Sequence, residues 1–104
     1  MTTFLDLVTV VVYDLHHGGF INYANDLQQL ANQALDKNLS DDNRRNAFIK
    51  IDARCHIKWF GDYYLPHLSQ KDWWGRLEKL SKSTKKTCIF LFTGEVSTLL
   101  KHKQ

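Results

Sequence analysis

The chain has 104 residues, of which 43% are hydrophobic and 24% are charged, and this composition excludes an intrinsically disordered protein. The length is enough for one hydrophobic core, so we expect a single domain over residues 1–104. No apolar run of the sequence approaches the roughly 20 residues of a membrane span. Because the first residues also lack the basic region of a secretory signal, we expect a cytoplasmic protein with no membrane partner.

The net charge of +3 is divided unevenly along the chain. Residues 1–42 contain one basic and six acidic residues, whereas residues 43–104 contain thirteen basic and five acidic residues. Such an asymmetry favours an anionic partner for the second part, either nucleic acid or an acidic protein. A solvated basic surface, or self-association of an acidic face with a basic one, are the alternatives.

The first part of the chain predicts a strand followed by a helix. Residues 4–15 are rich in valine and apolar on both sides of a two-residue repeat, which is typical of a central strand. Residues 16–19 form the expected turn. From residue 20 to about residue 37 the apolar residues recur with helical spacing, and residues 38–46 are a polar loop.

The second part predicts further strands around one more helix. Residues 48–60 alternate between apolar and polar side chains, as a strand or a pair of short strands does. Ser69 to Asp72 is an N-cap pattern that begins a helix extending to about Ser83. Residues 88–93 form another apolar strand, and residues 96–100 are a short edge strand or a helical turn. Cys55 and Cys88 are interpreted as buried free thiols.

This order of elements predicts an α+β fold of the ferredoxin-like type, with the order βαββαβ. In that fold, one antiparallel sheet carries two helices on one face. The other face of the sheet is left open for a partner or ligand. The polar side of residues 50–58 would form part of that open face.

Residues Val11-Val12-Tyr13-Asp14-Leu15 resemble the opening strand of the Cas2-like superfamily, which includes the VapD and SinR-like proteins. Members of this group begin with a hydrophobic strand that ends in an aromatic-Asp pair, followed by an amphipathic helix. The segment from Cys88 to Gly94 is similar to the apolar strand that closes the SinR-like domains. Elsewhere the resemblance consists mainly of the order of the elements.

The resemblance implies a symmetric homodimer in which Asp14 of each protomer faces a shared cleft. There the two carboxylates would bind Mg²⁺ or Mn²⁺, because these ions prefer oxygen ligands and retain several waters. The metal would activate water for attack on a phosphodiester of RNA or DNA. The expected function is therefore that of a CRISPR-associated or toxin–antitoxin protein that binds nucleic acid, with metal-dependent nuclease or endoribonuclease activity as its expected chemistry.

Asp14 and His16 are the candidate catalytic residues, and Asp14 is also the candidate metal ligand. An imidazole titrates near neutral pH and can act as a general base, but His16 and His17 point in opposite directions in an extended chain. At most one of them would therefore join Asp14. The alternative is that Asp14 only caps the turn that follows it.

The candidate residues for contact with nucleic acid or a partner are basic or aromatic side chains on the predicted sheet face and the second predicted helix. A basic stripe can meet phosphates or an acidic protein, and an exposed Trp can stack on a base. An ordinary solvated face, and partial burial of the Trp, are the alternatives. These candidates are Lys50, Arg54, His56, Lys58, Arg76, Lys79, Lys82 and Trp74.

A second class of function remains open beside the nuclease. The same charged faces and aromatic residues would suit a non-enzymatic protein-binding module, such as an antitoxin, an immunity protein or an inhibitor from a phage or mobile element. The sequence contains no complete catalytic set in one chain, so whether the protein is an enzyme is left undecided.

Overall fold

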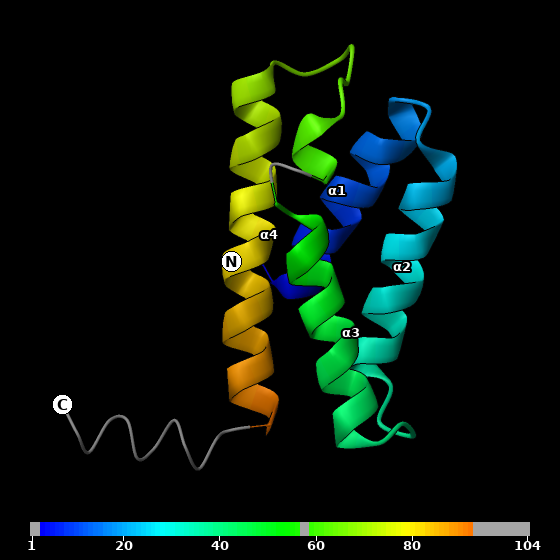
Figure 1. Ribbon diagram of the computed structural model, residues 1–104, viewed down its shortest axis with the longest axis vertical. Coiled ribbons are helices and arrows are strands. Elements are labelled where there is room, and N and C mark those ends of the chain that lie inside the picture. The colour runs from blue at the N-terminus through cyan, green and yellow to red at the C-terminus, as the bar shows by residue number, and fades with distance from the viewer. Residues whose placement is uncertain (1–2, 57–58, 93–104) are drawn as a thin grey trace, which may run out of the picture.

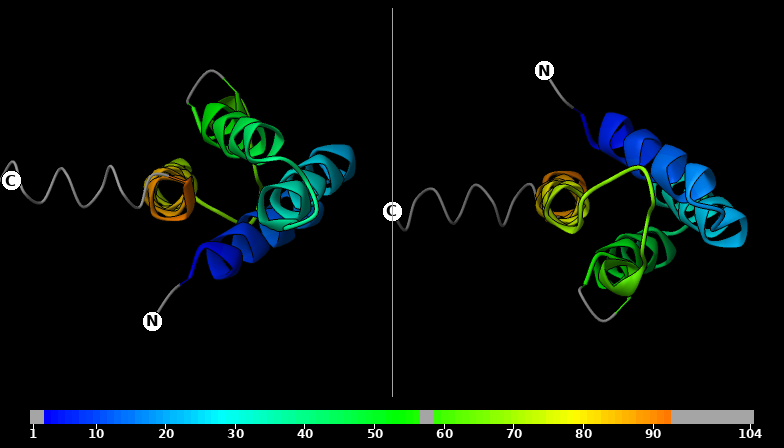
Figure 2. Two further views of the ribbon diagram at one scale, coloured as in Figure 1. Left: turned by 90° about the horizontal axis from the view of Figure 1, so that it is seen from below. Right: turned by 90° about the horizontal axis from the view of Figure 1, so that it is seen from above.

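The structure, a computed structural model, describes residues 3–56 and 59–92, which form a bundle of four α-helices (Figure 1). The helices are α1 (Phe4–His17), α2 (Ile21–Leu35), α3 (Asp41–Arg54) and α4 (Gln70–Phe92), with a short 3₁₀ helix η1 (Phe60–Asp62) before α4. Each α-helix packs against the next along the chain, and α4 also packs against α1. Seen end-on, the four helices therefore surround one core (Figure 2). No helix within the described ranges is long and apolar enough to cross a membrane.

The core is built from one apolar stripe on each helix, at the spacing of three and four residues that a helix requires. In α1 the buried stripe occupies the positions i, i+4, i+7 and i+11. The large buried side chains of α4 follow the same rule, and η1, which contacts α4, adds the buried Phe60. These core residues include Phe4, Val8, Val11, Leu15, Leu27, Phe48, Ile51, Phe60, Trp73, Leu77 and Leu80.

Polar caps determine where three of the helices begin. The Thr3 hydroxyl accepts a hydrogen bond from the Asp6 N–H, and the Asp6 carboxylate accepts one from the Thr3 N–H, which forms a capping box at the start of α1. Ser40 caps α3 in a similar way. Ser69 accepts a bond from the Asp72 N–H and so confirms the cap predicted for α4. Gly19, with φ of 91°, adopts the left-handed conformation that favours glycine and separates α1 from α2.

The predicted strand over residues 4–15 is wrong, because this segment is helix α1. Val8 and Val11 are buried. Val10, which lies between them, is 40% exposed, and Tyr13 is 62% exposed. The segment is thus covered on one side only. Burial of this stripe outweighs the modest preference of β-branched residues for strands.

The predicted strand over residues 48–60 is also wrong, because most of this segment belongs to α3. Two patterns coexist in it: alternation along the sequence, and a helical stripe of Phe48, Ile51 and Cys55. The second pattern is the one that the fold buries, and it leaves Ile49 62% exposed. The predicted polar loop of residues 38–46 is correspondingly shorter, because α3 begins at Asp41.

The third predicted strand, residues 88–93, is wrong as far as Phe92, because α4 continues to that residue. Thr93 and the segment 96–100 lie outside the described residues. The two predicted helices are confirmed, the first as α2 and the second as the first part of α4. Since the described part of the chain contains no strand, the ferredoxin-like α+β fold, and the open sheet face with it, are replaced by an all-helical bundle.

Candidate functional site

Asp14 lies inside the bundle in the last turn of α1, with no exposed surface. One carboxylate oxygen, Oδ2, accepts a hydrogen bond of 2.5 Å from Nη1 of Arg76 on α4. The other oxygen, Oδ1, lies 3.1 Å from Nε2 of His67, in the connection before α4. Charge-assisted hydrogen bonds of this kind offset the cost of burying a carboxylate. Asp14 therefore ties α1 to α4 and to the segment that leads into α4.

His17, rather than His16, lies beside this network. The His17 ring meets the His67 ring edge-on, with 4.6 Å between the ring centroids, and the Tyr13 ring stacks on His17 at 5.6 Å. His16 is two residues from Asp14, which in a helix places it on the opposite side, and it is exposed. The extended-chain argument that paired His16 with Asp14 thus does not apply to this segment.

The Asp14–His67 pair has the geometry with which proteins orient an imidazole for proton transfer or for metal binding. Within the described residues, however, no group of three His, Cys, Asp or Glu side chains could hold a metal ion. Both oxygens of Asp14 are also engaged by side chains of the same chain. Catalysis by Asp14 and His16, and Mg²⁺ or Mn²⁺ at Asp14, stay predictions.

The predicted basic stripe is divided by the helical geometry of α3. Lys50 and Arg54, four residues apart, border a hollow between α2 and α3, whereas Asp52 faces α4. Nε of Arg54 lies 2.6 Å from the Asp26 carboxylate on α2, and the Arg54 guanidinium covers the Trp59 ring at 4.6 Å. Arg54 therefore joins two helices of the same chain.

The remaining candidates are distributed over α4 and its surroundings. His56, Trp74 and Lys82 border a second hollow, between the end of α3 and α4. The Trp74 indole N–H donates to the Gly61 carbonyl at 2.9 Å, and Lys82 pairs with Glu78 at 2.9 Å. Arg76 is bound to Asp14, and Lys79 is exposed. Lys58 lies outside the described residues.

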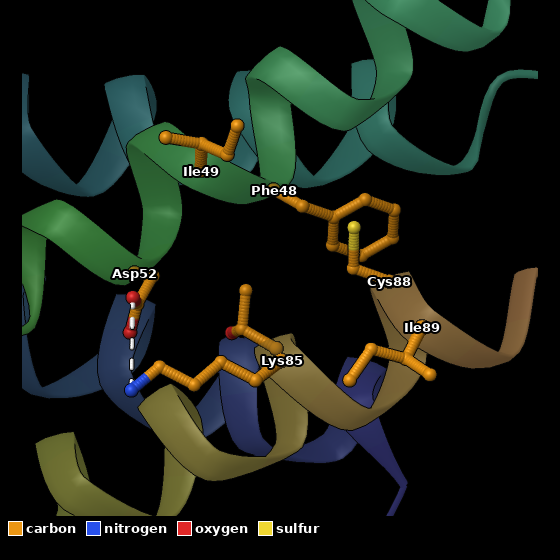
Figure 3. A pocket seen from close by; sticks show the side chains of 7 residues that line it. Phe48, Ile49, Asp52, Lys85, Cys88 and Ile89 are labelled. Atoms are coloured by element: carbon orange, nitrogen blue, oxygen red, sulfur yellow. Dashed lines mark ion pairs between the residues drawn. The ribbon is translucent and has the colours of Figure 1, made fainter. Parts of the chain in front are cut away.

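A groove with a mainly apolar lining, which the sequence did not predict, lies between α3 and α4 (Figure 3). Its volume is about 260 Å³. Ile49 on α3 and Ile89 on α4 form its walls and are 62% and 44% exposed. We refer to it as the α3–α4 groove; its lining residues are Phe48, Ile49, Asp52, Thr84, Lys85, Cys88 and Ile89.

The interior of the groove offers little hydrogen-bonding capacity. The Thr84 hydroxyl donates to the Leu80 carbonyl of its own helix at 2.6 Å. Asp52 accepts a hydrogen bond from Ser81 and pairs with Lys85 at 4.0 Å, which closes one end of the groove (Figure 3). At the other end, burial raises the pKa of the Cys88 thiol, so that this thiol stays protonated at neutral pH.

No sequence signal for the groove was available without the fold. Ile49 was assigned to the buried side of a strand, whereas α3 turns it outward, next to the exposed side of α4. Once residues 41–54 are known to be a helix, its projection places Ile49 outside the buried stripe that contains Phe48 and Ile51. No family model, curated protein or solved structure matches the chain.

Proposed function

We propose that the protein is a non-enzymatic protein-binding module, and that the α3–α4 groove accepts the apolar face of a helix from its partner. The observation that carries the proposal is the pair of exposed isoleucines, Ile49 and Ile89, on either side of an apolar hollow. Exposed apolar surface that lines a concave feature is typical of an interaction site. The protein would act by occupying a surface of another protein.

The size of the groove favours side chains of a protein over a small ligand. Its volume of about 260 Å³ is below that of pockets that enclose drug-sized molecules. Two or three apolar side chains from successive turns of a helix match such a groove, as in known helix-in-groove complexes. The two helices that form the walls supply a rigid frame, since their positions depend on the core of the bundle.

The internal pairing of two arginines supports this proposal over nucleic-acid binding. Arg54 and Arg76 were both expected to contact phosphates, yet each binds a carboxylate of its own chain. Each arginine thus commits part of its charge and one of its N–H groups to a structural bond inside the chain, which leaves it less suited to phosphate contact than a free basic side chain.

Selection from a library of helical peptides tests the proposal. The peptides would be about 15 residues long, crosslinked across one turn so that they stay helical in water, with Leu, Ile or Phe at one face. We expect the wild type to enrich a set of these peptides. The variant Ile49→Gln should bind the enriched peptides about tenfold more weakly, because it removes apolar contact area.

Leu5→Gln is the matched control, because Leu5 is an aliphatic residue of α1 that is 47% exposed and does not line the groove. It should bind the enriched peptides as the wild type does. Equal loss of binding in the two variants, or no enrichment by the wild type, would contradict the proposal.

A further inference from the structure

The charges of the bundle are divided between its two pairs of helices. Helices α1 and α2 contain three acidic residues and no Lys or Arg, whereas α3 and α4 contain ten basic and five acidic residues. Helices α3 and α4 lie on the side of the bundle opposite to α1 and α2 (Figure 2). The residues that line the α3–α4 groove all belong to the two basic helices.

Basic side chains also border the groove itself. Lys85 is a lining residue, and its side chain is 63% exposed. Arg45 stands one helical turn before Ile49, and its guanidinium lies 5.7 Å from the centroid of the Phe92 ring. Arg45 is also close enough to Cys88 to lower the pKa of that thiol, in opposition to the larger effect of burial.

The acidic residue of the groove is already neutralised by its neighbours. Of the lining residues in the part of the chain that the structure describes, Asp52 alone is acidic. It accepts a hydrogen bond from Ser81 and pairs with Lys85, and its side chain is only 22% exposed. Lys85 and Arg45 approach carboxylates of their own chain, Asp52 and Asp42, only to 4.0 Å and 3.9 Å, and their side chains are 63% and 45% exposed. A partner in the groove can therefore still meet these two positive charges beside an apolar floor.

We infer that the partner helix is acidic, with carboxylates beside the apolar residues that enter the groove. This inference rests on the proposed function and names the chemistry of the partner for the same site. Carboxylates on the partner would lie near Arg45 at one end and near Lys85 on the α4 wall. Complementary charge of this kind speeds association and makes it sensitive to salt.

The probe for this inference is a peptide enriched in the selection, prepared in two forms that share the apolar face. One form carries Glu at the positions beside that face, and the other carries Gln at the same positions. Fluorescence anisotropy would measure the Kd of each form at about 50 mM and about 500 mM salt, which span weak and strong screening. We expect the Glu form to bind more tightly by about tenfold at low salt and to lose most of this advantage at high salt.

Two double variants locate the charge that the peptide recognises. Arg45→Gln with Lys85→Gln removes two charges from the groove border, and should weaken binding of the Glu form by about three- to tenfold. Lys71→Gln with Lys79→Gln removes two exposed charges nearer the start of α4, and should change the Kd by less than about twofold.

The outcomes separate the two proposals. If the Glu and Gln forms bind equally at both salt concentrations, the partner is not recognised through acidic residues, although the groove still binds a helix. If neither form binds the wild type more tightly than Ile49→Gln, the proposed function fails as well. Displacement of the Glu form by a short single-stranded oligonucleotide at a lower concentration than unlabelled peptide would assign the basic border to nucleic acid and overturn the inference.

Discussion

The carboxylate of Asp14 shows how a single polar residue can organise a small core. Its side chain is 1% exposed, while the side chains of its partners Arg76 and His67 are 39% and 21% exposed. The negative charge is thus inside the bundle, and the positive charge reaches the surface. This arrangement satisfies both carboxylate oxygens and leaves Arg76 partly hydrated, which reduces the cost of burying the pair.

Replacement of Asp14 by Ala should lower the free energy of unfolding by about 2 to 4 kcal/mol, because it leaves Arg76 and His67 without their shared acceptor. Urea denaturation followed by circular dichroism measures the loss. Asp42→Ala is the control, since Asp42 is 88% exposed and lies 3.9 Å from Arg45, and it should cost less than about 0.5 kcal/mol. Equal effects of the two substitutions would show that the buried network contributes nothing to stability.

Cys55 makes the fold sensitive to alkaline pH. Burial, and next to it the Asp52 charge, raise the pKa of the Cys55 thiol from its ordinary value of 9.0 to about 12. Above pH 9 the unfolded chain loses this proton while the folded chain keeps it, so stability should fall between pH 9 and pH 12. Tyr63, with a pKa raised to about 12 by burial and by a hydrogen bond with Tyr23, acts in the same direction.

The substitution Cys55→Ala should therefore flatten the decline of stability with pH, although it lowers stability at neutral pH. Urea midpoints at about pH 8 and about pH 10.5 would show this as a smaller difference than in the wild type. Cys88→Ala removes the more exposed thiol, and should therefore have a smaller effect on the difference between the urea midpoints at the two pH values. A wild-type urea midpoint that does not fall from about pH 8 to about pH 10.5 would refute the raised pKa of the Cys55 thiol.

At the scale of the helix, polar caps fix the starts of α1, α3 and α4, whereas α2 has no side-chain cap at its start. Thr3→Ala should destabilise the protein by about 1 kcal/mol, because it removes the hydroxyl that accepts the Asp6 N–H at the start of α1. Thr9→Ala in the exposed middle of the same helix should be neutral or slightly stabilising, because alanine has the higher helix propensity. Thermal denaturation of both variants measures the contrast, and a larger loss for Thr9→Ala would contradict the cap.

The helices that the sequence predicted correctly are those with unambiguous spacing. In α2 the residues Ala24, Leu27, Ala31 and Ala34 recur every three or four positions and the residues between them are largely polar, so no other period fits. In α1 the exposed valine Val10 hides the same spacing. The pair Thr3 and Asp6 was the available signal for a helix there, because a capping box occurs at helix starts.

Of the network around Asp14, only Asp14 itself could be picked out from the sequence. Asp14 stood out in the sequence, but its partners are 53 and 62 positions away along the chain. That separation is bridged only when α4 packs against α1, which local patterns do not specify. The α3–α4 groove has the same origin, since each wall is an exposed isoleucine of a different helix and becomes recognisable only when the two helices are neighbours.

The whole molecule presents an acidic pair of helices on one side and a basic pair on the other, with the apolar groove on the basic side. The fold directs polar residues inward at Asp14 and apolar residues outward at Ile49 and Ile89. The burial of Asp14 is explained by its hydrogen bonds to Arg76 and His67, which hold α1 and α4 together. The exposure of Ile49 and Ile89 is the feature on which the proposed binding function rests.

The most direct test of the groove as the binding surface is a titration of the isotopically labelled protein with a peptide from the selection, followed by amide chemical shifts in NMR spectra. We expect the largest shifts at residues 48–52 and 84–89, with small changes in α1 and α2, because only the walls of the α3–α4 groove contact the peptide. Shifts centred on α1 and α2, or on the surroundings of Asp14, would contradict the account.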